Sequence, residues 1–306
     1  MTGSTTIAIE GREIQLTNLD RILWPEQGYT KHDLVEYYGA VFSFISPHLR
    51  QRPLVFTRYP NGIKEASFYQ KNAPQYLPEW IRTFAWAGSK GIKHYVLVEA
   101  QADLIWLANQ ACIEIHPWMS QTFTIENPDY IVFDLDPSEQ NTFEEIVSVA
   151  RLLKDLMGKL GLDVYLKTSG SKGLHIYLPI VPRYSYSQVR SFAQMIAQLI
   201  CNVVPDIATI QRSLQHRGKR IYVDYLQNGL GKTICAPYSV RPRDGATVST
   251  PIGWQELESI RPGDFTIRTV LERLKKVGDL FQEVLNDRQE LEKAIKILGI
   301  SQRSEL

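Results

Sequence analysis

The chain has 306 residues, of which 44% are hydrophobic and 22% charged, which allows a sizeable core and excludes wholesale disorder. Its 34 Lys and Arg residues nearly balance 33 Asp and Glu residues, so nucleic-acid binding would require a local basic patch. Three scattered cysteines without a C-x-x-C pair (Cys112, Cys201 and Cys235) indicate buried free thiols and argue against structural zinc. No signal peptide or membrane-length apolar run is found, so we expect a soluble, cytoplasmic protein with no membrane contact.

The first third of the chain predicts a mixed lobe of strands and helices. Residues 5–17 alternate as in a hairpin, and residues 17–24 predict a short helical piece that ends before Pro25. From Thr30, apolar residues recur at helical spacing, which predicts a helix that Pro47 ends. The remaining predicted elements are strands around the turn at 60–62, a strand over 94–99, a helix over 102–113 and a strand over 113–118.

From residue 129 the pattern changes to strand–helix–strand–strand–helix–strand, which resembles a split βαβ or RNA-recognition-like sheet. The predicted elements are strands over 129–137, 164–170, 174–180 and 220–228, and helices over 142–160 and 185–203. A helical segment is predicted over 264–298. We therefore expect an α+β fold in one domain, with an N-terminal lobe over about 1–128, a second lobe over about 129–260 and a helical tail over 261–306.

Two aspartates stand close together in the strand over 129–137. Asp134 and Asp136 are two residues apart, so both carboxylates project from one face of that strand. Like charges at this spacing repel unless a cation lies between them, and oxygen ligands suit Mg²⁺ or Mn²⁺. The alternative is a pair of solvated aspartates at the end of a strand.

Asp224 adds a third carboxylate in the middle of the strand over 220–228, where aspartate is disfavoured. It is either an ion-pair partner of Arg220 or the third ligand of a metal site. With Asp134 and Asp136 on a neighbouring strand, we favour the metal site.

A glycine loop links the strands over 164–170 and 174–180. Its two glycines, Gly170 and Gly173, permit a tight turn whose backbone amides point at an anion. Ser169 and Lys172 add donors suited to phosphate, and His175 follows in the return strand. An ordinary hairpin turn with a surface lysine is the alternative.

Three motifs in order, DLD (134–136), SGSKGLH (169–175) and VDYLQN (223–228), resemble those of the archaeo-eukaryotic primase superfamily. The similarity is greatest to the polymerase domain of ligase D, the end-joining DNA repair polymerase, and extends over nearly the whole chain. It implies a primase-polymerase fold in which a catalytic RNA-recognition-like sheet packs against a second mixed α/β lobe. The supporting stretches are TNLDRILWP (17–25), RPLVFTRYPNG (52–62), FYQKN (68–72), IEIHPW (113–118) and APYSVRPRDGATVSTPI (236–252).

The resemblance also implies roles for individual residues. Asp134, Asp136 and Asp224 would bind two divalent cations, Mn²⁺ or Mg²⁺. The residues that would bind the nucleotide, an NTP or dNTP, are His116, Ser169, Lys172, His175, Gln227 and Arg241. His116 would lie near the sugar, although a buried, hydrogen-bonded histidine is the alternative there.

DNA-binding roles fall on a second set of residues. The resemblance implies that Phe68 and Tyr69 stack on bases, although they could also be simply core and surface members of a strand. Arg21 and Lys31 would hold the 5′-phosphate of a DNA end. A further basic position of the family aligns with Thr57, and Arg58 is next to it. The basic run of Arg217, Lys219 and Arg220 is either a hairpin tip in water or a backbone contact, and its place before Asp224 favours the contact.

The implied reaction is attack of a primer 3′-hydroxyl on the α-phosphate of a bound nucleotide, with ribonucleotides preferred and DNA ends as substrates. Implied partners are Ku and a DNA ligase, and the implied location is the nucleoid. The main alternative is a primase-polymerase in priming or damage tolerance, which shares every catalytic motif. IVFDLDPS (131–138) also resembles the opening motif of haloacid-dehalogenase phosphatases, but it lies far from the N-terminus and lacks their later motifs. A DNA-bridging module without catalysis would gain nothing from carboxylates that repel phosphate.

Overall fold

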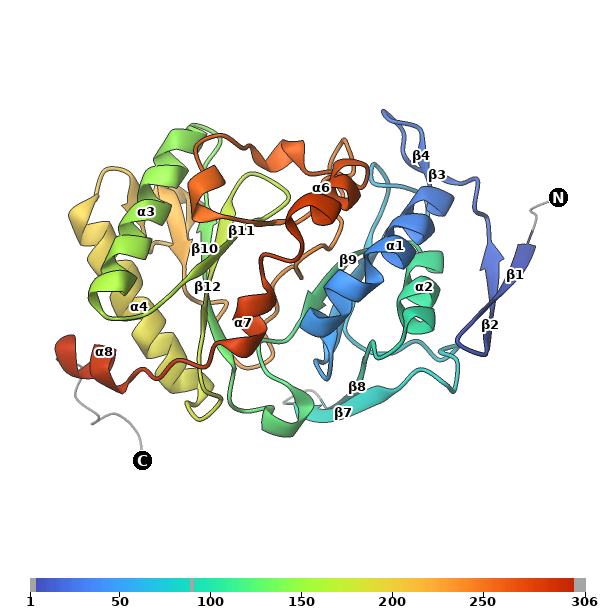
Figure 1. The fold of residues 1–306 in the computed structure, drawn as a ribbon, viewed down its shortest axis with the longest axis horizontal. Coiled ribbons are helices and arrows are strands. Elements are labelled where there is room, and N and C mark those ends of the chain that lie inside the picture. The colour runs from blue at the N-terminus through green and yellow to red at the C-terminus, as the bar shows by residue number, and fades with distance from the viewer. Residues whose placement is uncertain (1–3, 89–90, 300–306) are drawn as a thin grey trace. The chain divides into compact units, whose positions relative to one another are not determined.

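The computed structural model describes residues 4–88 and 91–299, and the chain divides into two compact units (Figure 1). Unit 1 contains the residues up to Phe123 with Thr233–Thr250 and Pro262–Asp279, and unit 2 contains the remainder. The chain changes unit five times, at 123/124, 232/233, 250/251, 261/262 and 279/280. The segment Thr233–Thr250 therefore lies in unit 1, although the sequence pattern placed it in the second lobe. Across the described ranges, no helix combines the length and apolar character needed to cross a membrane.

Unit 1 is built on a sheet of five strands, with helices beside it. The strands β6, β5, β8 and β7 follow one another in the sheet, and β9 also pairs with β5. The helices α1 and α2 contact each other and β9, and β2 contacts α2. The elements of unit 1 are β1 (Ser4–Ile9), β2 (Arg12–Thr17), β3 (Ile22–Trp24), β4 (Tyr29–Thr30), α1 (Lys31–Leu49), β5 (Leu54–Arg58), β6 (Phe68–Gln70), β7 (Thr83–Gly88), β8 (Gly91–Val96), α2 (Gln101–Asn109), β9 (Cys112–Pro117) and α6 (Thr269–Val277).

Helix α1 begins as predicted but does not end at Pro47. Thr30 caps it in a box with Asp33, whose backbone amide donates to the Thr30 hydroxyl while its carboxylate accepts from the Thr30 amide. The helix continues to Leu49 with Pro47 in its last turn. Proline removes one backbone donor there, but Ile45, His48 and Leu49 are all buried, and their packing keeps the turn helical.

The prediction of a short helical piece over residues 17–24 is wrong. Asn18 has a φ of 49°, which ends β2, and Ile22–Trp24 forms β3, which pairs with β4. The segment has too few residues to form a stable helix by itself, and pairing with β4 decides its structure. Strand β7 was not predicted, because the sequence Thr83–Gly88 lacks an alternating pattern and pairs with β8 through its backbone.

Unit 2 contains the predicted strand–helix–strand–strand–helix–strand unit. Its sheet has the order β13-β14-β10-β12-β11-β15, and all neighbours are antiparallel except β13 and β14. The four inner strands have the order of a split βαβ unit, which confirms the predicted RNA-recognition-like sheet. The elements of unit 2 are β10 (Tyr130–Asp136), α3 (Phe143–Lys159), β11 (Tyr165–Thr168), β12 (Leu174–Pro179), α4 (Tyr186–Val203), β13 (Ala208–Thr209), α5 (Leu214–Arg217), β14 (Ile221–Asp224), β15 (Pro251–Ile252), α7 (Gln282–Asn286) and α8 (Glu292–Ile297).

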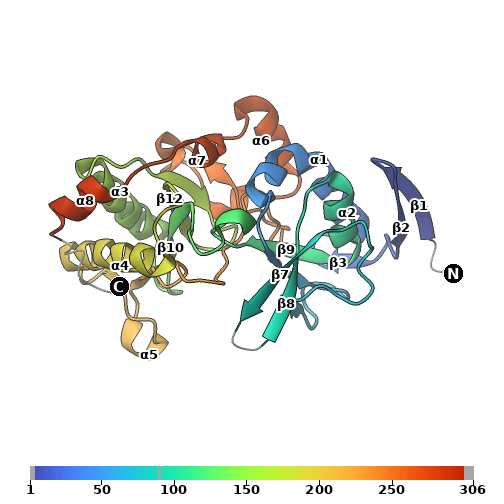
Figure 2. The same cartoon turned by 90° about the horizontal axis from the view of Figure 1, so that it is seen from below.

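The helices α3 and α4 contact each other and lie along this sheet, α3 against β12 and α4 against β10 (Figure 2). Both have the predicted start, because Thr142 and Ser185 cap them in boxes with Glu145 and Gln188. Along β10, Ile131, Phe133 and Leu135 are fully buried core residues of one parity. The other parity of β10 carries Asp134 and Asp136.

Two predicted elements are shorter than expected. The strand over 220–228 ends at Asp224, where the carboxylate accepts from the backbone amide of Leu226 and turns the chain. The helical tail over 264–298 is divided into α6, α7 and α8, and α6 belongs to unit 1. Gly278 ends α6 with a φ of 68°, which explains the first break.

Candidate active site

Three aspartates lie on one face of the unit 2 sheet. Asp134 in β10 pairs directly with Asp224 in β14, and Asp136 lies two residues further along β10. Directly opposed side chains of antiparallel strands have Cβ atoms about 4.5–5.5 Å apart. Two carboxylates at this separation repel each other, so the pair of Asp134 and Asp224 creates a local demand for positive charge.

Asp224 is held by hydrogen bonds from its own strand and turn. The Tyr222 hydroxyl donates to Oδ1 at 3.1 Å, and the Gln227 side-chain amide donates to Oδ2 at 3.0 Å. Burial, followed by the nearby Asp224 carboxylate, raises the pKa of Tyr222, so its phenol stays protonated and remains a donor. Gln227, which was predicted to bind the nucleotide, is thus a hydrogen-bond donor to Asp224 in this structure.

Asp136 is paired with a cation of the protein. Arg217 Nη1 donates to Asp136 Oδ2 at 3.0 Å, and the Arg217 guanidinium lies 4.6 Å from the centre of the Tyr222 ring. Among residues 4–88 and 91–299, no three His, Cys, Asp or Glu side chains converge as a ready metal-binding group. In this arrangement Asp136 is turned to Arg217 rather than to the other two aspartates.

The chemistry of these groups nevertheless fits a hard divalent cation. All three side chains offer carboxylate oxygen, the ligand that Mg²⁺ and Mn²⁺ favour, and they share one sheet face. Asp136 has a half-exposed side chain, so it is accessible for coordination once it leaves Arg217. Asp134, Asp136 and Asp224 are therefore the residues of this chain that would hold such an ion.

A histidine and a lysine lie across the sheet from Asp134, on the side away from Asp224. His175 in β12 pairs directly with Asp134, and Lys167 in β11 pairs directly with His175. His175 Nε2 lies 3.4 Å from Asp134 Oδ1, and Lys167 Nζ lies 2.8 Å from His175 Nδ1. Both side chains are buried. Sequence reasoning predicted His175 but missed Lys167, whose only signal was a lysine in a short strand, between Leu166 and Thr168.

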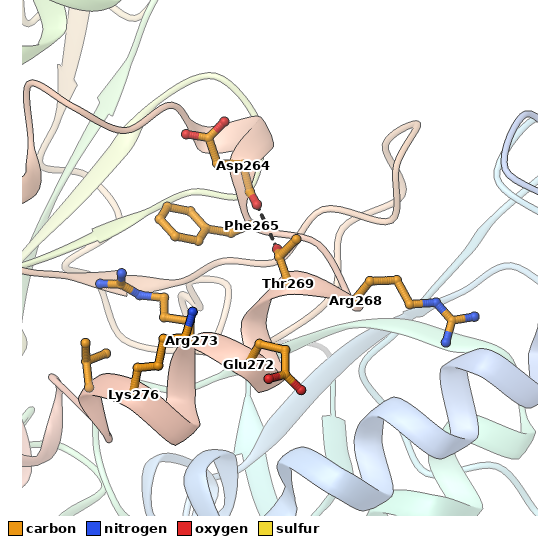
Figure 3. Close-up of a pocket in the computed structure, with 8 residues that line it drawn as sticks. Asp264, Phe265, Arg268, Thr269, Glu272, Arg273 and Lys276 are labelled. Carbon is orange, nitrogen blue, oxygen red and sulfur yellow. Dashed lines mark hydrogen bonds between the residues drawn. The ribbon is translucent and has the colours of Figure 1, made fainter.

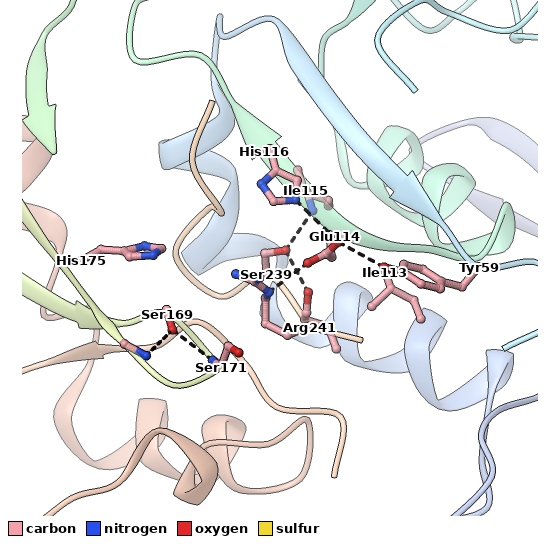
Figure 4. A network of polar contacts seen from close by, with 12 residues as sticks. Tyr59, Ile113, Glu114, Ile115, His116, Ser169, Ser171, His175, Ser239 and Arg241 are labelled. Carbon is pink, nitrogen blue, oxygen red and sulfur yellow. Dashed lines mark hydrogen bonds and ion pairs between the residues drawn. The ribbon is translucent and has the colours of Figure 1, made fainter. Parts of the chain in front are cut away.

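The glycine loop after β11 is closed by Ser169 (Figure 4). The backbone amides of Ser171 and Gly173 both donate to the Ser169 hydroxyl oxygen at 3.1 Å. These two amides are therefore used within the loop rather than held open for an anion. Gly170 has a φ of 69°, and a Cβ on Gly173 would lie 2.0 Å from the Leu135 carbonyl oxygen. Glycine is thus required at Gly173 because the loop passes directly against β10.

Lys172 projects from the same loop into solvent. Its side chain is 59% exposed, and Nζ lies 3.7 Å from Oε1 of Glu139, which is itself almost fully exposed. A pair this exposed is worth about 0–1 kcal/mol, so Lys172 can exchange Glu139 for a phosphate at little cost.

In unit 1, the two other predicted nucleotide ligands share a buried glutamate (Figure 4). Arg241 Nε lies 2.9 Å from Glu114 Oε1, and His116 Nε2 lies 3.9 Å from Glu114 Oε2. The Tyr59 hydroxyl also donates to Oε2 at 3.4 Å. Burial alone would raise the pKa of Glu114, but the contacts with His116 and Arg241 outweigh it and lower the pKa to about 2. Sequence reasoning missed Glu114, whose signal was an acid at the same parity as His116 in a buried strand.

The predicted end-binding residues of unit 1 form a compact basic cluster of Arg21, Lys31 and Arg58. Lys31 is only 5% exposed, and its ammonium donates to the Asn109 carbonyl at 2.8 Å and to the Thr17 hydroxyl at 3.4 Å. Burial, followed by the charges of Arg21 and Arg58, lowers the pKa of Lys31 to about 8. Three cations held together in this way are expected to attract an anion strongly.

The geometry of the cluster differs in part from the prediction. Arg21 lies in the turn before β3 and donates to the Pro60 carbonyl at 3.2 Å and to the Asn61 side chain. Thr57, the position aligned with a basic residue of the family, is buried, and Arg58 takes part in the cluster instead.

Phe68 and Tyr69 lie on β6 and are 57% and 59% exposed, so the alternative that either is a core residue is wrong. Successive residues of a strand face opposite sides, and both sides are open at this edge strand. The ammonium of Lys71 lies 5.6 Å from the Tyr69 ring centre. Exposed aromatic side chains beside a cation are suited to stacking on nucleic-acid bases.

The basic run before β14 is not a hairpin tip. It begins in α5, where Arg217 is buried against Asp136, and Arg220 donates to the backbone carbonyls of Arg217 and His216. Lys219 is exposed. The proximity of Asp136 draws Arg217 inward, so Lys219 is the member of the run that is open to a nucleic-acid backbone in this arrangement.

A pocket of about 480 Å³ lies beside α6 in unit 1 (Figure 3). Arg268, Arg273 and Lys276 line it together with two acids, Asp264 and Glu272. The charges of opposite sign are interspersed, and none of the predicted site residues lines this pocket. It is therefore separate from the candidate active site.

The fold and the carboxylate face together define a nucleotidyltransferase of the primase-polymerase type. Residues 30–281 match the family described as "LigD, primase-polymerase domain". The chain belongs to this family.

Several relatives and one solved structure are similar to this chain. The chain is 37% identical over 281 residues to the bifunctional non-homologous end joining protein LigD of Bacillus subtilis. The match covers 91% of this chain and 45% of that protein. It is 34% identical over 269 residues to the multifunctional non-homologous end joining protein LigD of Mycolicibacterium smegmatis. That match covers 87% of this chain and 35% of the relative. The polymerase domain of Mycobacterium tuberculosis ligase D in complex with DNA superposes with a TM-score of 0.84 at 31% identity, with coverage of 90% and 99%.

These similarities confirm the predicted family, the primase-polymerase fold and the enzyme class, a nucleotidyltransferase of the primase-polymerase type. Membership of the family implies dependence on divalent metal ions. The chain spans less than half the length of the two LigD relatives described above. The predicted free, buried state of Cys112, Cys201 and Cys235 is also confirmed.

Proposed function

We propose that this chain extends or gap-fills DNA ends during double-strand break repair, with ribonucleotides preferred and two divalent cations, Mn²⁺ or Mg²⁺, required. The direct cross-strand pairing of Asp134 with Asp224, with Asp136 on the same face, is the observation that carries the proposal. It supports a metal-dependent reaction because three carboxylates on one face repel a nucleotide unless cations accompany it.

The carboxylates Asp134, Asp136 and Asp224 would hold the cations, and Asp136 would leave Arg217 to do so. Two such ions, when bound, lower the pKa of a primer 3′-hydroxyl and stabilise the charge of a leaving pyrophosphate. Lys172 would move from Glu139 to the triphosphate and offset its negative charge. Ser169 keeps the loop closed through two backbone amides, which fixes the position from which Lys172 reaches.

His116 and Arg241 would also bind the nucleotide, with His116 near the sugar. A site that hydrogen-bonds a 2′-hydroxyl leaves its own donor or acceptor unpaired when that hydroxyl is missing. This supports a preference for ribonucleotides. Phe68 and Tyr69 would stack on bases of the DNA, because both rings are exposed.

Recognition of broken ends is assigned to Arg21, Lys31 and Arg58. A terminal 5′-phosphate carries more charge than an internal phosphodiester, so clustered cations select an end over continuous duplex. This cluster supports end joining over the alternative of a primase-polymerase that begins strands. Ku and a DNA ligase would be partners at such ends, and the site of action would be the nucleoid.

The test is a gap-filling assay on DNA whose downstream strand is either phosphorylated or unphosphorylated, with ribonucleotides or deoxyribonucleotides and with Mn²⁺ or Mg²⁺. We expect faster filling with the 5′-phosphate and with ribonucleotides. Equal rates and equal affinities for both kinds of end would support the primase-polymerase alternative. No extension under any condition, with the metals present, would contradict the proposed function itself.

A further inference from the structure

A row of four directly paired side chains crosses the unit 2 sheet. Lys167 in β11 is opposite His175 in β12, His175 is opposite Asp134 in β10, and Asp134 is opposite Asp224 in β14. Because opposed residues share one face, the row places a lysine, a histidine and two aspartates in sequence. The metal-binding role proposed above uses its aspartate end and leaves Lys167 unexplained.

Lys167 is an unusual residue for its surroundings. Its side chain is 0% exposed, and its ammonium lies 2.8 Å from His175 Nδ1 and 5.8 Å from the centre of the Tyr177 ring. A buried ammonium is strongly unfavourable unless it is hydrogen-bonded, and an apolar side chain such as methionine would fill the same space without that cost. The fold alone therefore does not account for lysine at this position.

The two neighbours of His175 determine which ring nitrogen carries its proton. The Asp134 carboxylate offers acceptor oxygens to this ring, and Oδ1 lies 3.4 Å from Nε2, which favours an N–H at Nε2. A charged lysine only donates, so Nδ1 accepts from Lys167. A neutral imidazole has one N–H, and this pair of neighbours places it on Nε2, directed at Asp134.

We propose that Lys167 is a positioning residue, which holds His175 in the Nε2–H form and thereby orients the Asp134 carboxylate for cation binding. This inference rests on the proposed function only in its assumption that Asp134 is a metal ligand. Groups that orient a ligand from behind commonly change metal affinity by about 10–100-fold when they are removed. Lys167 acts two side chains away from the cation, through His175.

The first test is the tautomer of His175 in the unaltered protein without metal, nucleotide or DNA. The chain has six histidines, so ¹⁵N-histidine labelling gives a sparse spectrum, and the His175 signals are assigned from their loss in His175→Gln. We expect a protonated Nε2 and an unprotonated, hydrogen-bonded Nδ1. The opposite tautomer, or a mixture of the two, would overturn the proposal without any variant of Lys167.

The second test compares Lys167→Met with Lys159→Met, a control at an exposed lysine in the last turn of α3. Lys167→Met should lose the single His175 tautomer and bind Mn²⁺ about 10–100-fold more weakly, measured by electron paramagnetic resonance of free Mn²⁺. Lys159→Met should change neither quantity. An unchanged tautomer and Mn²⁺ affinity in a folded Lys167→Met would contradict the proposal.

The two proposals fail in different ways. If the unaltered protein shows the expected tautomer and tight Mn²⁺ binding but extends no primer, the proposed function fails while the role of Lys167 stands. If it extends primers but His175 has the other tautomer, the role of Lys167 fails alone.

Discussion

Glu114 shows how a buried carboxylate can organise two other side chains. One of its oxygens forms an ion pair with Arg241, and the other lies near His116 and the Tyr59 hydroxyl. Because its pKa is lowered to about 2, the carboxylate is charged around neutral pH. Its contacts with His116 and Arg241 are therefore permanent features of unit 1.

We expect Glu114→Gln to raise the KM for nucleotides by roughly tenfold or more, because a hydrogen bond to a charged group contributes about 1.5–3 kcal/mol. The neutral amide retains the size of the side chain but weakens its hold on Arg241 and His116. Steady-state primer extension at varied nucleotide concentration measures the effect. The control is Glu144→Gln, because Glu144 is an exposed glutamate of α3 paired with Arg261. Unchanged KM in Glu114→Gln would mean that these residues do not bind the nucleotide.

Lys31 predicts how end recognition depends on pH. A lysine is charged below its pKa, and the pKa of Lys31 is lowered to about 8, so its charge is lost as the pH rises through that value. A terminal phosphate has its second pKa near 6 and stays dianionic over the same range. The preference for a 5′-phosphorylated end should therefore decline between about pH 7 and pH 9.

Binding titrations at fixed salt with phosphorylated and unphosphorylated ends would measure this preference. In Lys31→Arg the preference should become independent of pH over that range, because arginine does not lose its proton there. A preference that stays constant through pH 9 in the unaltered protein would remove Lys31 from the phosphate site.

At the scale of elements, the glycine loop is fixed by a close approach of backbone to backbone. A Cβ on Gly173 would lie 2.0 Å from the Leu135 carbonyl oxygen, so Gly173→Ala must displace either the loop or β10. We expect a loss of about 1–3 kcal/mol of unfolding free energy in urea or thermal denaturation, with weaker nucleotide binding. Gly158→Ala in α3 meets no atom within 4 Å and should instead stabilise the fold by about 0.5–1 kcal/mol. Equal effects of the two substitutions would contradict this interpretation.

The elements that could be predicted from the sequence are those with strong local signals. The helical patterns over 142–160 and 185–203 predicted α3 and α4, and alternation along β10 indicated its buried parity. Elements decided by distant partners were missed, such as β3, which exists through its pairing with β4.

The candidate site was predictable in part for the same reason. The spacing of Asp134 and Asp136 indicated a shared face. The pairing of Asp134 with Asp224 and His175, and of His175 with Lys167, depends on register between strands. The inward turn of Arg217 toward Asp136 depends on the fold of α5, which no local pattern indicated.

At the scale of the whole molecule, the chain builds each unit from separate segments. Thr233–Thr250 returns to unit 1 and is joined to its earlier elements by several hydrogen bonds. The Tyr37 hydroxyl donates to the Tyr238 carbonyl at 2.9 Å, and the Ile115 amide donates to the Ser239 hydroxyl at 2.9 Å. Unit 1 therefore depends on residues that follow the catalytic sheet in the sequence.

We expect a fragment that ends at Lys232 to lack a folded unit 1, because α1 and β9 lose these partners. Near-ultraviolet circular dichroism and limited proteolysis would show lost tertiary packing and cleavage within unit 1. A control fragment that ends at Gly299 retains every described element and should resist protease like the full chain. A protease-resistant unit 1 in the shorter fragment would show that the returning segment is dispensable.

The five changes of unit also restrict how such a domain can be inherited. Recombination that joins parts of different genes preserves a fold when the junction falls between self-sufficient pieces. Here a junction anywhere between residues 124 and 279 separates segments that one unit needs. A gene fusion can therefore acquire or lose this polymerase only as one piece.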